Sequence, residues 1–214
     1  MKNFYKPFFA VFSYRSLPIH IAMWAITYVC VITGLDWAYF QAVNHEPFMR
    51  LFQPALFVGF FVPFLLPPAL YVFGQLRKNI ELKQLGLLEA TAALLGWVTS
   101  SLYKAFTGRL SPHMQVSTTG GYLDTSHTFN FGFLRDGIFW GWPSSHTAVA
   151  FAMAVAFAVA YGKRMRSSVL VILYALYIGI GVSLGAHWLS DVVAGVLLGS
   201  LVGYAVGMAY KPQG

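Results

Sequence analysis

Long apolar runs separated by short polar segments dominate this sequence. No charged residue occurs between Arg15 and Asp36 or between Arg50 and Arg77, and four further apolar runs follow, the first of them interrupted by Glu89. A helix needs about 20 mostly apolar residues to cross the hydrocarbon core of a bilayer, so each run predicts one membrane span. The six predicted spans are residues 17–35, 53–75, 84–103, 144–162, 167–185 and 188–209. The pattern therefore predicts an all-α, polytopic membrane bundle of six transmembrane helices, folded as a single domain over residues 1–214.

Proline and glycine positions inside these runs predict local geometry. The second span is expected to be kinked or broken, because it contains Pro54, Pro63, Pro67 and Pro68. Close packing between the last two spans is expected from their small residues, which are Gly179, Gly181, Gly185, Gly195, Gly199, Gly203 and Gly207.

Composition supports the assignment to a membrane. Apolar residues make up 57% of the chain and charged residues 10%, against roughly 45–50% and about 25% in soluble domains. The net charge of +7 raises the possibility of nucleic-acid binding. The basic residues, however, lie in small groups between apolar runs and form no stripe with interleaved aromatic residues, so no nucleic-acid partner is expected. Cys30 is the single cysteine, which excludes an intramolecular disulfide.

The distribution of Lys and Arg predicts the orientation. One set of connecting segments holds ten of these residues, namely Lys2, Lys6, Arg15, Arg77, Lys78, Lys83, Lys163, Arg164, Arg166 and Lys211. The opposite set holds four, namely Arg50, Lys104, Arg109 and Arg135. This asymmetry places both termini in the cytoplasm, and it places residues 104–136 and the turn at His187 outside the bacterial inner membrane.

Two polar clusters lie at predicted outer span ends. Ser144, Ser145 and His146 open the fourth span, where free N–H groups and the helix dipole favour an anion such as phosphate. His187 and Asp191 are four residues apart and share one helix face, so the carboxylate could orient the imidazole. The alternative readings are an ordinary capped helix start and a chance surface pair.

Cations in the outer segments form a further candidate phosphate site. Lys104 and Arg109 follow the third span, and Arg135 lies in the long segment before the fourth. Both residue types bind phosphate, although cations beside a span are also common interface anchors. The sequence contains no His-x-x-x-His or Cys-x-x-Cys ligand pair, so neither a metal site nor another cofactor is expected.

These clusters resemble the type-2 phosphatidic acid phosphatase superfamily, which includes membrane lipid phosphatases and soluble vanadium haloperoxidases. The family pattern is Lys followed seven residues later by Arg-Pro, then Pro-Ser-Gly-His, then Ser-Arg, five residues, His, three residues, Asp. The matching positions in this chain are Lys104, Pro112, Pro143, Ser144, His146, His187 and Asp191. The six spans, with a long outer segment before the second motif, also look like the bacterial members.

The chain departs from the family pattern within these motifs. Ser111 and Gly181 stand where the family has its two motif arginines, and Ser145 replaces the usual glycine. Arg109 and Arg135 are the cations that could take the place of the missing arginines.

The resemblance implies a metal-independent lipid phosphatase that acts in two displacement steps. His187 would form a phosphohistidine, Asp191 would orient it, and His146 would act as general acid and then general base. Charge on the phosphate would be stabilised by Lys104, Ser144, the backbone N–H of Ser145 and Arg109, with Arg135 as a further candidate.

The expected substrate is a phosphomonoester or diphosphate on a membrane lipid, hydrolysed at the outer face of the inner membrane. Undecaprenyl diphosphate, phosphatidylglycerol phosphate, phosphatidic acid and lipid A are the candidates. Two alternatives are a lipid phosphotransferase and a non-catalytic lipid-binding or transport protein on the same scaffold. The sequence leaves the oligomeric state open.

Overall fold

The computed structural model describes residues 5–112, 118, 120–162 and 164–210, and the regular secondary structure in these ranges is helical. The helices in these ranges are α1 (Tyr5–Val11), α2 (Leu17–Ile32), α3 (Leu35–Val43), α4 (Phe48–Phe52), α5 (Pro54–Leu76), α6 (Ile80–Thr107), α7 (Ser145–Ala160), α8 (Met165–Ser183) and α9 (Leu189–Tyr210), with a 3-10 turn η1 (Tyr14–Ser16). The predicted all-α class is confirmed.

Among the described residues, five helical segments are long and apolar enough to cross a membrane, by length and composition. They are Tyr14–Ile32, Met49–Leu76, Ile80–Thr107, Met165–Ser183 and Leu189–Tyr210. The remaining predicted span, 144–162, forms the shorter helix α7 of 16 residues, or about 24 Å at 1.5 Å per residue. Six spans were expected and five meet the length criterion, because α7 begins only after Ser144 and ends before Tyr161.

The predicted second span, 53–75, is the single helix α5 and is not broken, while a kink in it stays a prediction. Pro63, Pro67 and Pro68 all lie inside α5, which continues to Leu76. Much of its surface consists of exposed phenylalanine and leucine side chains, including Phe57, Phe64 and Leu65. These residues suit contact with lipid tails, so the helix is both continuous and apolar outwards.

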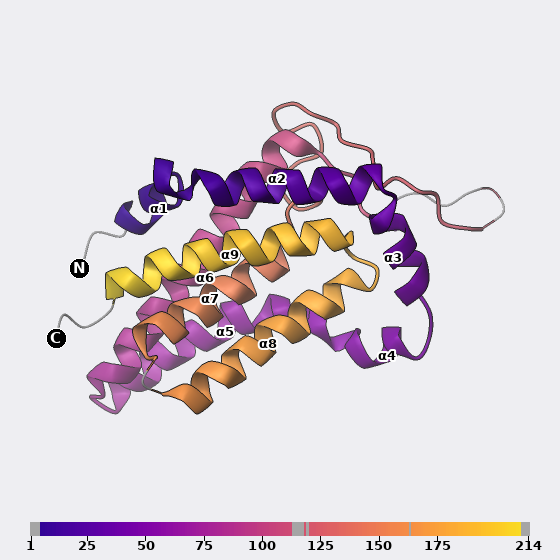
Figure 1. Cartoon of the computed structure of the whole chain (residues 1–214). Helices are drawn as coiled ribbons and strands as arrows, with labels where there is room; N and C mark the ends of the chain where they lie inside the picture. The colour runs from indigo at the N-terminus through magenta and orange to yellow at the C-terminus, as the bar shows by residue number, and fades with distance from the viewer. Residues whose placement is uncertain (1–4, 113–117, 119, 163, 211–214) are drawn as a thin grey trace.

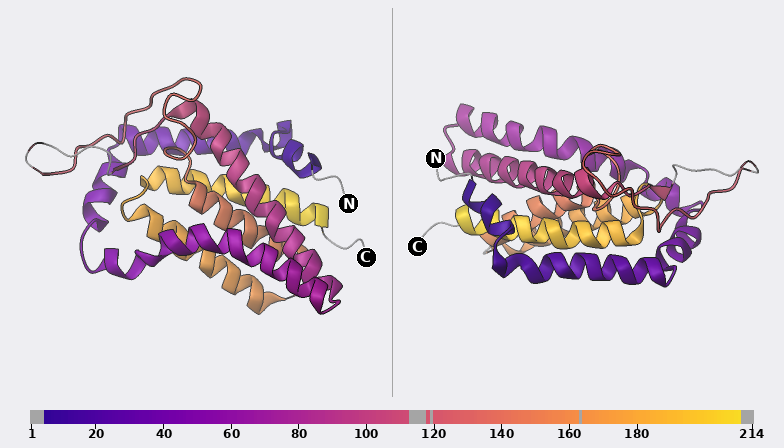
Figure 2. Two further views of the ribbon diagram at one scale, coloured as in Figure 1. Left: turned by 180° about the vertical axis from the view of Figure 1, so that it is seen from behind. Right: turned by 90° about the horizontal axis from the view of Figure 1, so that it is seen from above.

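Helix α7 is the centre of the bundle (Figure 1). It packs against α9, α6, α8 and α5, and all residues from Thr147 to Ala154 are buried. The view from above in Figure 2 places α2 on one side of α9 and the α5–α6 pair on the other. A short alanine-rich helix can take this central place because its neighbours, and not lipid, cover its surface.

The two ends of the bundle differ in what they carry. Figure 1 shows α1, the end of α9 and the α5–α6 connection at one end, and α3 and the starts of α7 and α9 towards the other. The N-terminal segment and the α5–α6 connection therefore lie at the same end, and the side of the membrane that this end faces stays a prediction. Lys2, Lys163 and Lys211, which belong to the larger set of basic residues, lie outside the described residues.

The glycines of α9 pack against α7, so the expectation that they join the last two spans is wrong. A Cβ atom added at Gly195 would lie 2.8 Å from the carbonyl oxygen of Ser144. Added at Gly199 or Gly203, it would overlap the carbonyl oxygens of Ala148 or Ala152 respectively. Both residue numbers rise together along the contact, so α7 and α9 are parallel and both begin at the same end of the bundle.

We predict that Gly199→Ala destabilises the fold, whereas Gly179→Ala is tolerated. A methyl group at Gly199 meets the α7 backbone, while at Gly179 the nearest atoms are side-chain carbons of Thr147 and Val192, both at 3.6 Å. Alanine also favours a helix over glycine by about 1 kcal/mol. Thermal unfolding of the two variants in detergent measures the difference. Equal melting temperatures would contradict the close α7–α9 contact.

Candidate active site

The candidate site lies where α7 and α9 begin and α6 ends. The backbone N–H of Ser144 donates to the carbonyl oxygen of Asp191 at 3.0 Å, which joins the two helix starts directly. Lys104 belongs to the last turn of α6 and contributes electrostatically at both His146 and His187. Three segments that are distant in sequence therefore meet at one end of the bundle.

His187 and Asp191 form a buried pair. His187 Nδ1 lies 3.3 Å from Asp191 Oδ2, and the two side chains are 7% and 0% exposed. The same carboxylate oxygen accepts from the backbone N–H of Trp188 at 3.2 Å. This contact closes the first turn of α9, as a third-position acid does in a capping box. With Nδ1–H donated to an ionised Asp191, the lone pair of Nε2 is available as a nucleophile.

Burial also acts on the protonation of His187. Loss of solvent around the imidazole lowers the pKa of His187, while the hydrogen bond to Asp191 opposes this change and Lys104 reinforces it. The net direction is downwards from the ordinary value of about 6.5. His187 is consequently held neutral at neutral pH, as a nucleophile must be.

The serines at the start of α7 have different partners. Ser144 is fully buried and caps the helix, since its Oγ accepts from the Thr147 N–H at 3.4 Å and from Thr147 Oγ1 at 3.1 Å. Its own hydroxyl hydrogen remains to donate. Ser145 Oγ lies 2.9 Å from Ser100 Oγ, so its hydroxyl group joins α7 to α6, and its backbone N–H lies in the first turn.

His146 is half-buried beside α5. A Cβ atom added at Gly59 would lie 3.3 Å from its Cδ2, so a glycine makes room for the ring. Lys104 and His187 act on it electrostatically, which places it with the other predicted site residues.

Lys104 is a buried cation with spare hydrogen-bonding capacity. Lys104 is 1% exposed. Its Nζ donates to the carbonyl oxygens of Phe139 at 3.3 Å and Gly141 at 3.0 Å. An ammonium group has three donors, so one remains for a ligand. The other two hold the segment that leads into α7.

Arg109 has a different role from the one expected of it. Its Nε and one terminal nitrogen donate to the Ser126 carbonyl oxygen at 3.0 and 2.6 Å. The guanidinium also donates to Asp36 at 2.7 Å, Asp191 at 2.5 Å and Ser190 Oγ at 2.8 Å. These contacts use all five donors of a guanidinium. Arg109 therefore has no donor left for a phosphate in this conformation, and its expected place in the phosphate site is not supported.

Arg135 is the other cation that could replace a motif arginine. Its side chain is exposed, lies against Gly132 and makes no hydrogen bond or ion pair with the described residues. The structure does not bring it into the buried cluster, and its expected role stays a prediction.

The two positions that lack motif arginines are both tightly enclosed. A Cβ atom at Gly181 would overlap the Cβ atom of Ala55 and lie 3.1 Å from the Phe52 carbonyl oxygen. An arginine there would have to displace the start of α5. Ser111 is 4% exposed, and its Oγ has no hydrogen-bond partner in the described part of the chain.

In the sequence, Asp36 stands out only as the charged limit of the first apolar run. The structure places it at 0% exposure against Arg109 and α9. Its position in the first turn after Gly34, at the end of a membrane span, is the signal that could have drawn attention to it.

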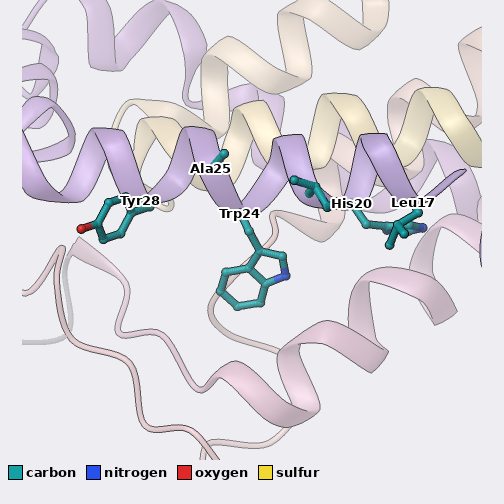
Figure 3. Close-up of a pocket in the computed structure, with 6 residues that line it drawn as sticks. Leu17, His20, Trp24, Ala25 and Tyr28 are labelled. Atoms are coloured by element: carbon teal, nitrogen blue, oxygen red, sulfur yellow. The ribbon is translucent and has the colours of Figure 1, made fainter.

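Two further features bear on what the site could hold. In the described ranges, no group of three or more His, Cys, Asp or Glu side chains is arranged to hold a metal ion. A hollow of about 620 Å³ lies along α2, lined by Leu17, His20, Ile21, Trp24, Ala25 and Tyr28. Figure 3 shows these side chains along that helix. The hollow is apolar and shares no lining residue with the cluster of Lys104, His146 and His187, so it is not part of the candidate active site.

Comparison with known proteins shows to which family the chain belongs. The model of the PAP2 superfamily matches residues 84–212, and the chain belongs to that superfamily. The lipid A 1-phosphatase of Porphyromonas gingivalis is 35% identical over 136 residues, which cover 61% of this chain and 30% of that protein. The chain therefore spans about a third of that relative.

A solved structure supports the fold. The PAP2-type phosphatidylglycerolphosphate phosphatase of Bacillus subtilis aligns with a TM-score of 0.54 and 18% identity, covering 94% of both chains. At this identity the likeness shows the fold alone. Together with the apolar helices, family and fold identify a membrane protein.

We predict that His187 titrates below pH 6.5, because burial lowers its pKa. A pH titration followed by NMR of protein labelled with nitrogen-15 at histidine, in detergent, measures the midpoint of His187 protonation. The His187 resonance is assigned by its absence in His187→Asn. A midpoint above 6.5 would show that the hydrogen bond to Asp191 outweighs burial, and would contradict the expected direction.

Replacing Gly181 with Ala should lower the melting temperature, and the double variant Ala55→Gly/Gly181→Ala should recover most of the loss. The added methyl group overlaps that of Ala55, and the second substitution removes the overlapping group. Both proteins are compared by thermal unfolding in detergent, with Ala55→Gly alone as the control. If the double variant is no more stable than Gly181→Ala, the enclosure of Gly181 does not explain the missing arginine.

Proposed function

We propose that this protein hydrolyses a phosphomonoester or diphosphate on a membrane lipid through a phosphohistidine at His187. The observation that carries the proposal is the buried His187–Asp191 pair, which lies beside the start of α7. Membership of the PAP2 superfamily and the match to a relative named as a lipid A 1-phosphatase support it.

In the first step, Nε2 of His187 attacks phosphorus. Asp191 accepts a hydrogen bond from Nδ1–H and stabilises the positive charge that develops on the ring. His146 donates a proton to the leaving oxygen of the lipid. In the second step, His146 takes a proton from water as the water attacks the phosphohistidine, and this releases inorganic phosphate and regenerates His187.

Charge on the phosphate oxygens is stabilised from α6 and α7. The free donor of Lys104, the hydroxyl of Ser144 and the backbone N–H of Ser145 are the proposed contacts. The start of α7 carries no acidic residue in its first turn, which keeps its positive dipole available to an anion. Arg135 is proposed as a further phosphate contact, and Arg109 is left out because its donors are in use.

The proposed location is the outer face of a bacterial inner membrane. Support comes from the excess of Lys and Arg in the segments opposite the site, and from the position of the cluster at the other end of the bundle from α1 (Figure 1). The substrate would then reach the site from the outer leaflet.

Purified protein in detergent should release inorganic phosphate from at least one of undecaprenyl diphosphate, phosphatidylglycerol phosphate, phosphatidic acid and lipid A. His187→Asn and His146→Asn should each lower kcat by at least about 10³-fold, because the nucleophile or the proton donor is lost. Glu46→Gln, an exposed change on the connection between α3 and α4, is the control for handling and folding.

The partition of labelled phosphate separates the alternatives. Label in inorganic phosphate supports hydrolysis, and label on an acceptor lipid shows a phosphotransferase. Lipid binding with no turnover on any substrate would overturn the enzymatic proposal. Full activity of folded His187→Asn would overturn the proposed nucleophile.

A further inference from the structure

The carboxylate of Asp36 is committed to α9 and to Arg109, although Asp36 lies in α3. Its Oδ1 accepts from the backbone N–H of Ser190 at 2.8 Å, and its Oδ2 accepts from Ser190 Oγ at 2.6 Å and from Arg109 at 2.7 Å. Asp36 lies in the first turn of α3, but its side chain does not cap that helix. A carboxylate 154 residues away in sequence therefore closes the N-terminal turn of α9.

Arg109 extends this contact to Asp191. Its two terminal nitrogens bind one carboxylate each, Asp36 and Asp191, and all three side chains are 0% exposed. The ring of Phe129 lies over the guanidinium at 4.9 Å, so the ion pairs are shielded from water. Electrostatic interactions are strong in such surroundings, and an unpaired member is costly. Arg109 thus links Asp36 to Asp191 through two buried ion pairs.

Asp191 in turn holds His187. One of its oxygens faces Arg109 and the other faces His187 Nδ1. The guanidinium and the imidazole thus share the single carboxylate of Asp191. The more of the Arg109 positive charge another carboxylate balances, the more of the Asp191 negative charge acts on the imidazole.

We propose that Asp36, acting through Arg109 and Ser190, is a positioning residue that sets the orientation and basicity of the His187 nucleophile. The inference rests on the proposed function for its effect on turnover. Asp36 lies outside residues 84–212 that match the family model, so the segment before the matched region contributes to the active site.

The pH dependence follows from the charges around His187. The titratable and charged groups acting on it are Asp191 of α9, Lys104 of α6, Arg109 after α6 and His146 of α7, with Asp36 of α3 acting through Arg109. Asp36→Asn removes one negative charge, so the positive charge of Arg109 is balanced by Asp191 alone. Protonation of His187 becomes less favourable, and its midpoint moves to lower pH.

Asp36→Asn is expected to lower kcat roughly 10- to 100-fold through misplacement of the nucleophile, with KM within about twofold. The acidic limb of kcat/KM and the NMR midpoint of His187 should both move to lower pH. Asp36→Glu, which restores the charge, should recover part of kcat and return the midpoint towards that of the parent. Glu46→Gln is the matched control, because it removes an exposed carboxylate at the same end of the bundle.

Ser190→Ala provides a second test if Asp36→Asn does not fold. It removes the hydroxyl that bridges Asp36 and Arg109 without changing the charge, so a several-fold lower kcat and an unchanged midpoint are expected. Folded Ser190→Ala with the parent's kcat would overturn the proposal.

The outcomes also separate this inference from the proposed function. A parent protein that is inert on every lipid would sink the function, whereas an unchanged His187 midpoint in folded Asp36→Asn would sink the positioning role without any assay of turnover. Loss of kcat only in proportion to lost folded protein, with the midpoint unmoved, would show that Asp36 is merely structural. Each result therefore supports or overturns one proposal.

Discussion

The end of the bundle where α7 and α9 begin depends on the guanidinium of Arg109. This group lies in an apolar interior between two carboxylates, and its removal would leave both as uncompensated buried charges, a situation that costs several kcal/mol. Through its contacts it holds α3, the segment at Ser126 and the start of α9 together. The segment at Phe139 and Gly141 is held in a similar way by Lys104. Two buried cations thus organise connecting segments that have little regular structure of their own.

Much of the fold could be predicted from hydropathy, because the bilayer imposes both the length and the composition of a spanning helix. The shorter length of α7 could not be predicted in this way, because an enclosed helix and a lipid-facing helix have similar apolar content. The sequence also did not predict which helix packs against the glycine face of α9. A repeat such as Gly195, Gly199 and Gly203 shows that some backbone approaches closely, but it does not say which one. The contact with α7 is set by tertiary packing.

The candidate site was predictable to the extent that short motifs encode it. The spacing of His187 and Asp191, and the Ser-Ser-His sequence at a helix start, are local features that a sequence displays. Asp36 and Arg109 are 73 residues apart, and nothing in either local sequence indicates the other. Arg109 was expected to bind phosphate because a cation near a phosphate motif has two possible partners, an anion from outside or a carboxylate from within. Only the three-dimensional arrangement distinguishes them.

The parallel arrangement of α7 and α9 has an electrostatic consequence. Two helices that begin side by side present two positive ends to the same small region, and these ends repel each other. Here the two ends are treated differently: α9 has Asp191 in its first turn and Asp36 hydrogen-bonded to its Ser190 N–H, while α7 has no acid in its first turn. One end is neutralised and the other is left open. For the proposed phosphate substrate, this asymmetry favours binding at the start of α7, so the two helix ends set the direction from which the phosphate approaches the His187 imidazole.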